Sequence, residues 1–95
     1  MKKIERQKFS NVWDALEDTP EQAANLRARS GLMIQIRTII EKRKWTQTEA
    51  AKHCGVTQPR INDLIHGRID CFSLDALVNI ASALGKRVEL ILEPA

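Results

Sequence analysis

Polar side chains with complementary hydrogen-bonding groups cluster between Gln58 and Asp63. Gln58 and Asn62 carry carboxamides, which both donate and accept hydrogen bonds, and Arg60 carries a guanidinium. These groups can read base edges in DNA, since a good bidentate pair with adenine or guanine contributes about 1–3 kcal/mol of discrimination. Pro59 either touches a thymine methyl group or only fixes the start of a helix. Asp63 can accept from cytosine N4 but repels phosphate, and two other roles stay open for Arg60: a phosphate contact or a pair with Asp63.

Two short helices joined by a tight turn are expected to position these side chains, within residues 46–68. Thr46 and Glu49 have the spacing of a capping box at the start of the first helix. Gly55 lies where the chain must turn sharply, and Thr57 can cap the second helix. The second helix turns an apolar face inward, made of Ile61, Leu64 and Ile65. The remaining polar positions of that helix therefore face outward.

Positive charge is concentrated on this motif and on the N-terminal end of the chain. Residues 42–68 hold six Lys or Arg against two acidic residues, a net +4, and residues 1–8 carry a net +3. Residues 9–41 and 69–95 each carry −2, so the whole chain is only +3. This distribution is the one that contact with phosphates requires. The candidate phosphate contacts by charge are Lys44, Lys52 and Arg68, for each of which a merely solvated side chain is the alternative.

The chain divides into residues 1–18, expected to be a mobile basic arm followed by a short helix, and a domain over 19–95. Thr19 and Pro20 predict the start of a helix that runs to about residue 43. Its expected apolar stripe has a four-residue period over Ala24, Ala28, Leu32, Ile36 and Ile40, with Met33 and Ile39 alongside. Gly31 interrupts the pattern, which leaves open one helix with a possible kink or two helices.

The C-terminal part of the chain predicts one more helix and then a β-strand. Ser73 caps the helix and Gly85 ends it. Within residues 86–94, Val88, Leu90 and Leu92 alternate with Glu89, Ile91 and Glu93, which is the pattern of a strand. A single strand cannot satisfy its own backbone groups, so we expect it to pair with its copy in a homodimer or with a strand of another protein. The expected dimer contacts are Val88, Leu90, Ile91 and Leu92.

Several classes of function have no support in the sequence. No apolar run is long enough to span a membrane, and no signal-peptide core follows the basic N-terminus, so the expected location is the cytoplasm. Cys54 and Cys71 form no disulfide framework and fit a reducing compartment. The spacing of these cysteines with His53 and His66 matches no zinc arrangement. We therefore expect no metal, no cofactor and no enzymatic activity.

The motif as a whole resembles the helix-turn-helix of Xre-type regulators, the group that includes the lambda and 434 phage repressors. The matching residues are Gln47, Ala51, Gly55-Val56-Thr57, Gln58, Ile61, Leu64 and Gly67. The resemblance implies an all-α, lambda repressor-like bundle with a long N-terminal helix, whose second motif helix enters the major groove of double-stranded DNA. It also makes Gln58 the foremost base reader and implies phosphate contacts at Thr46 and Gln47, to which we add the cap residue Thr57. Pro59 departs from the repressor pattern, in which a polar side chain is common there.

Over residues 11–92 the chain is similar to short HigA-like antitoxins and their relatives. The similarity rests on Trp13-Asp14-Ala15-Leu16, Pro20-Glu21-Gln22-Ala23-Ala24-Asn25-Leu26, Leu32-Met33, Gln58-Pro59-Arg60-Ile61, Phe72-Ser73-Leu74-Asp75-Ala76-Leu77 and Gly85-Lys86-Arg87-Val88, besides the motif itself. Members of this group are often encoded beside a RelE-like toxin. The sequence thus predicts a homodimeric repressor that binds a palindromic operator. The alternative is an antitoxin that neutralises a RelE-like toxin and autoregulates its operon.

Overall fold

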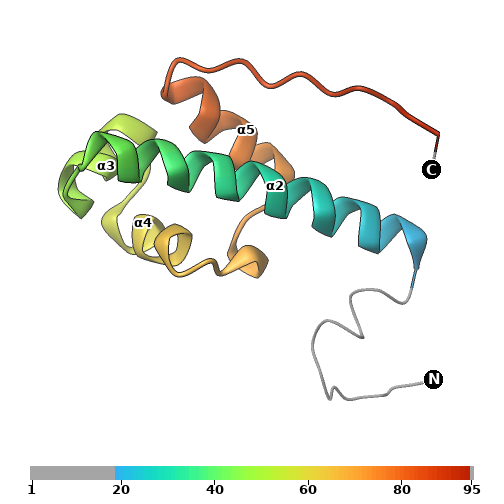
Figure 1. Cartoon of the computed structure of the whole chain (residues 1–95). Helices are drawn as coiled ribbons and strands as arrows, with labels where there is room; N and C mark the ends of the chain where they lie inside the picture. Colours follow the sequence, from blue (N-terminus) through green and yellow to red (C-terminus); the bar gives the residue numbers. More distant parts are fainter. Residues whose placement is uncertain (1–18, 95) are drawn as a thin grey trace.

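The computed structural model describes residues 19–94, and this part of the chain consists of α-helices and one short 3-10 helix (Figure 1). The elements are α2 (Pro20–Arg43), α3 (Gln47–Cys54), α4 (Gln58–Ile65), η1 (Ile69–Cys71) and α5 (Leu74–Ala83). The expected N-terminal arm and short helix of residues 1–18 lie outside the described residues. The long α2 packs against α5 and η1, while α3 packs against both α4 and α5.

Helix α2 is a single continuous helix, which answers the question left open by Gly31. Thr19 caps it by accepting a hydrogen bond from the backbone N–H of Gln22 at 3.0 Å, and Pro20 occupies the first turn. A Cβ on Gly31 would meet no atom within 4 Å, so this glycine lies at an open surface of the helix rather than at a break. The helix ends at Lys44, whose φ of 56° and ψ of 35° place it in the left-handed region.

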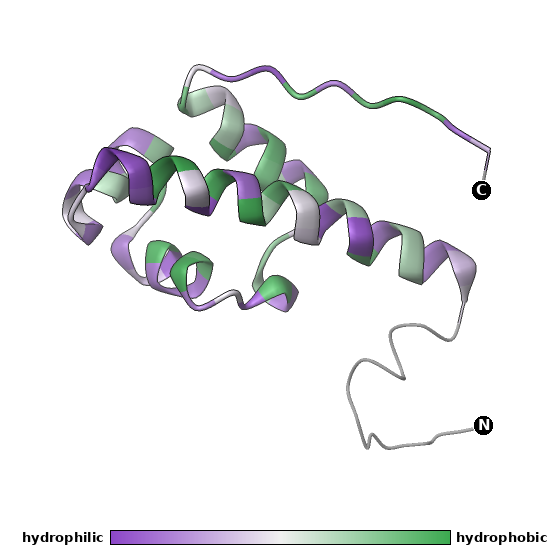
Figure 2. Cartoon of the chain, in the orientation of Figure 1, coloured by the Kyte–Doolittle hydropathy of each residue, from purple (hydrophilic) through white to green (hydrophobic). Residues whose placement is uncertain are grey.

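The buried face of α2 differs from the predicted four-residue stripe. Its buried side chains are those of Leu26, Met33, Ile36 and Ile40, whereas Ala24 and Ala28 are exposed. A residue turns about 100° around an α-helix, so a strict four-residue repeat drifts by about 40° per step and leaves the contact line. Spacings of three, four and seven residues, which separate Leu26, Met33, Ile36 and Ile40, stay on it. In Figure 2, apolar and hydrophilic residues are interspersed along the ribbon of α2.

One apolar core joins all of these elements. Each helix contributes fully buried side chains, of which the largest are Ile36, Ile61, Leu64 and Leu77. Trp45 is half-buried against this core, and its indole stacks on the His53 ring with centroids 4.0 Å apart. The core therefore fixes α3 and α4 against the long helix, which makes the motif a rigid unit.

The predicted C-terminal β-strand is wrong. Residues 86–94 are extended but form no strand, and the described part of the chain contains no strand at all. The segment is tied at its start, where the N–H of Lys86 donates to the carbonyl of Ala81 at 3.0 Å, and it then runs back along α2 (Figure 1). Alternating apolar residues make a strand only where a second strand offers its backbone groups, and none lies within residues 19–94.

Candidate nucleic-acid interface

The motif is built from two eight-residue helices, each started by a threonine. Thr46 accepts from the N–H of Glu49 at 3.1 Å, and Glu49 in return accepts from the N–H of Thr46 at 2.9 Å, which completes the predicted capping box. Thr57 accepts from the N–H of Arg60 at 3.4 Å at the start of α4. Between the helices, Gly55 has a φ of 72°, a conformation that side chains disfavour.

A side-chain hydrogen bond joins the N-terminal ends of the two helices. The carboxamide nitrogen of Gln58 donates to the hydroxyl of Thr48 at 3.0 Å, although the two residues lie ten positions apart. Both residues are exposed, as are the neighbouring Gln47 and Pro59. The exposed N-terminal ends of α3 and α4 thus lie together on one surface, which we call the motif face: Thr46, Gln47, Thr48, Thr57, Gln58 and Pro59.

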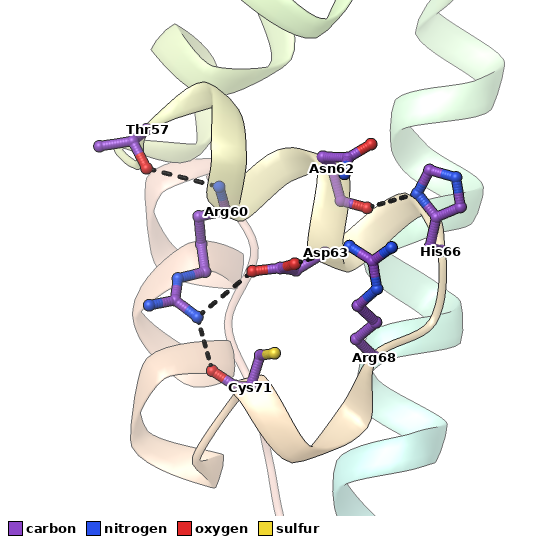
Figure 3. Close-up of polar contacts among 7 residues, drawn as sticks. All are labelled: Thr57, Arg60, Asn62, Asp63, His66, Arg68 and Cys71. Carbon is purple, nitrogen blue, oxygen red and sulfur yellow. Dashed lines mark hydrogen bonds and ion pairs between the residues drawn. The ribbon is translucent and has the colours of Figure 1, made fainter.

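Arg60 lies differently from the other candidate base readers. Its Nη1 donates to the carbonyl of Cys71 at 2.9 Å and lies 3.6 Å from a carboxylate oxygen of Asp63. The guanidinium also lies over the Phe72 ring, 5.4 Å from its centroid. The structure therefore places Arg60 in the ion pair with Asp63 that the sequence left open, and directs it toward η1 (Figure 3).

The remaining candidates are spread over the same end of the molecule. Asn62 is half-buried, and its backbone carbonyl accepts from the His66 N–H at the C-terminal end of α4. Arg68 donates to the other carboxylate oxygen of Asp63 at 3.0 Å. Lys44 and Lys52 are exposed, the first just before α3 and the second in its last turn.

The expected dimer residues do not belong to this surface. Val88 is half-buried, and Leu90 and Ile91 are 74% and 80% exposed. In Figure 1 their segment and α4 lie on opposite sides of α2. Lys86 to Leu90 line a groove of about 740 Å³ together with the outer surface of α2, including Gly31, Ile34 and Thr38.

Arg29 holds the loop after α4 and was missed by the sequence reasoning, which named Arg60 but not its contact with this loop. Arg29, half-buried in the middle of α2, donates to the carbonyls of Ile69 at 3.2 Å and Phe72 at 3.3 Å. Together with Arg60, it satisfies three carbonyls of one short segment from two sides. Arg29 lies three residues after the buried Leu26, and an arginine on the apolar side of a helix is the signal that could have identified it.

The two cysteines have different surroundings, with Cys54 buried and Cys71 exposed. Cys54 is buried in the core, and this desolvation raises the pKa of its thiol, so it packs as an apolar group. Within residues 19–94, no three His, Cys, Asp or Glu side chains come together as metal ligands would. Over the same residues, no helix has the length and apolar character needed to cross a membrane.

Comparisons with known proteins agree with this architecture. A family model described as a helix-turn-helix domain matches residues 15–93. A solved structure described as an XRE family transcriptional regulator is similar with a TM-score of 0.70 and 23% sequence identity, over 77% of this chain and 82% of that one. At this identity the likeness concerns the fold. Among curated proteins none matches the chain.

Proposed function

The chain belongs to the helix-turn-helix domain family, and from this premise we propose that it is a sequence-specific DNA-binding transcriptional regulator of the Xre type. The observation that carries the proposal is the hydrogen bond between Gln58 and Thr48, which fixes the N-terminal end of α4 beside that of α3. In helix-turn-helix proteins the second helix enters the major groove with its N-terminal residues toward the bases. The motif face has the composition that this arrangement requires.

In the proposed complex, Gln58 reads a base from its exposed position at the start of α4. One N–H of its carboxamide donates to Thr48, which restricts the orientation of the side chain and leaves the second N–H and the oxygen for a base. Pro59 lies beside it and offers only apolar contact, while Asn62 and Asp63 lie one turn further along. The backbone N–H groups at the start of α3, near Gln47, suit a phosphate because the N-terminal end of a helix attracts anions.

We further propose that the regulator is a repressor acting as a homodimer on a palindromic operator. A protein that occupies an operator inside a promoter excludes RNA polymerase from it. Support for a second copy comes from exposed apolar side chains in the groove along α2, Ile34 at 60% and Leu90 at 74% exposure. The next two residues of the chain, Ile91 and Leu92, are 80% and 99% exposed. Contiguous exposed apolar groups commonly mark interfaces, and their position away from α4 would leave the motif face uncovered.

The antitoxin role is a second candidate, supported by the similarity of residues 11–92 to HigA-like proteins. The same exposed Leu90, Ile91 and Leu92 would suit a protein partner of another kind. Co-expression with the neighbouring gene distinguishes the two candidates. A stable complex with a short, basic, RelE-like product favours the antitoxin, and separate elution of the two proteins opposes it.

The proposed phosphate contacts can be tested with Lys52. We expect Lys52→Ala to weaken binding to all duplexes about equally and to make the slope of log K against log salt shallower by about one unit, since one phosphate contact is lost. Fluorescence anisotropy with a labelled duplex over a series of salt concentrations measures both quantities. Lys86→Ala is the matched control, because Lys86 is also exposed but lines the groove along α2. Equal slopes for the two variants would contradict the assignment of Lys52.

A further inference from the structure

Asp63, in α4, occupies the centre of an ion-pair arrangement with Arg60 and Arg68 (Figure 3). One carboxylate oxygen lies 3.0 Å from Nη1 of Arg68 and the other lies 3.6 Å from Nη1 of Arg60. The Asp63 side chain is only 23% exposed, whereas the two arginines are about half exposed. Each arginine therefore has its own carboxylate oxygen, and the acid is the less accessible partner.

Two of the six basic side chains of residues 42–68 are therefore paired with a carboxylate of the protein itself. Arg60 is held further by the Cys71 carbonyl and the Phe72 ring, so its guanidinium is directed along the protein surface. Arg68 follows Gly67, whose φ of 70° turns the chain back toward Asp63. Nη1 of each arginine is engaged with Asp63, so a DNA phosphate that takes this nitrogen must displace the carboxylate.

We propose that Asp63 is a specificity-determining residue that acts as an internal counter-ion and withholds Arg60 and Arg68 from the phosphates of non-cognate DNA. The proposal rests on the proposed function, because it assumes that α4 faces DNA. Non-specific affinity comes almost entirely from phosphate contacts, so a carboxylate that occupies two arginines lowers it directly. Discrimination is the ratio of specific to non-specific binding, and it improves when the weaker complex is made weaker still.

The test is the affinity of Asp63→Asn for a short duplex of randomised sequence, measured by anisotropy over a series of salt concentrations. Asparagine keeps the shape of the side chain but removes the negative charge that pairs with both arginines. We expect binding to tighten by roughly ten-fold at low salt, and the slope of log K against log salt to steepen by about one to two units, one for each released arginine. Asp75→Asn is the matched control, since Asp75 is exposed in the first turn of α5 and lies in no ion pair within residues 19–94. It makes the same change in net charge without releasing an arginine, so its slope should stay that of the wild type.

A second set of variants tests whether the increase in duplex affinity and in salt slope depends on the arginines. Arg68→Gln should remove about one unit of slope in the Asp63→Asn background but change the wild-type slope little, because Arg68 is already occupied there. Equal slopes for Asp63→Asn and Asp75→Asn would overturn the proposal, as would an equal effect of Arg68→Gln in both backgrounds. Absence of duplex binding by the wild type at every salt concentration would instead remove the proposed function itself. If Asp63→Asn is unfolded by circular dichroism, the double variant Arg60→Gln/Arg68→Gln replaces it, and a slope well below that of the wild type then overturns the proposal.

Discussion

Lys44 is the residue whose backbone conformation departs most clearly from its type. It is the one non-glycine residue with positive φ in the described part of the chain, and its N–H donates to the carbonyl of Glu41 at 3.1 Å to close α2. Left-handed geometry costs a side-chain-bearing residue roughly 1–2 kcal/mol. Glycine is common at this position of a helix end, so the lysine at 44 has a reason other than backbone preference. Contact with a phosphate beside the start of α3 would be such a reason.

Lys44→Gly should therefore separate stability from binding. We expect the free energy of unfolding to rise by about 0.5–1 kcal/mol, because relief of the left-handed strain exceeds the added entropy of the unfolded chain. Urea unfolding followed by circular dichroism measures this change. DNA affinity should fall in the same protein, with a shallower salt slope. A loss of stability with unchanged affinity would contradict both parts of the interpretation.

The opposite substitution at Gly55 serves as the control for the backbone argument. Gly55 has a φ of 72°, and a Cβ there would meet the Cβ of Ala83 at 4.0 Å, which is an ordinary contact. Gly55→Ala consequently tests the conformational cost with little steric change. Its free energy of unfolding should fall by about 1 kcal/mol.

Local residue chemistry could be predicted from the sequence, and distant contacts could not. The capping box of Thr46 and Glu49 depends on residues three positions apart, so their spacing was sufficient. Arg60 donates to a carbonyl eleven residues away, and Arg29 to carbonyls forty or more residues away. No local pattern reports such partners, which is why the hydrogen bonds of Arg29 and Arg60 to the carbonyls of residues 69–72 were missed. The pair between Arg60 and Asp63 is local, three residues apart within α4, but it stayed one of several possibilities because the sequence does not show the Cys71 carbonyl that also holds Arg60.

At the scale of elements, the position of each helix could be predicted better than the face it buries. Helix starts and ends depend on caps, proline and glycine, and α2, α3, α4 and α5 all begin after the residues predicted to cap them. The face of α2 depends on where α5 and η1 cross it, and the predicted stripe followed a four-residue repeat that the helix geometry does not sustain. The prediction of a C-terminal strand was wrong for a related reason, since a strand requires the backbone groups of a partner strand.

Continuity of α2 leads to a prediction about Gly31. The residue is helical and exposed, and an added Cβ would meet nothing within 4 Å. Gly31→Ala should stabilise the protein by about 1 kcal/mol, which corresponds to a rise in Tm of about 4–8 °C for a domain of this size. Ala28→Gly is the matched control, exposed one turn earlier, and should lower Tm by a similar amount. A fall in Tm with Gly31→Ala would contradict an uninterrupted helix with an open surface at this position.

At the scale of the whole molecule, two surfaces have different chemical characters. The motif face is polar and is flanked by the exposed Lys44 and Lys52, whereas the groove along α2 is bordered by exposed apolar side chains. In our proposal the first binds DNA and the second binds another copy of the chain. A two-fold dimer would present two α4 helices to successive turns of one duplex, with half-sites about 10 base pairs apart.

Selection of duplexes from a randomised pool tests the central claim, sequence-specific recognition by α4, most directly. We predict that the wild-type protein enriches one two-fold symmetric sequence whose half-sites are centred about 10 base pairs apart. Gln58→Ala should lose preference at one position in each half-site, at a cost of about 1–3 kcal/mol for the bidentate pair. Recovery of unrelated sequences by the wild type, or the same enriched sequence with undiminished preference from Gln58→Ala, would contradict this account.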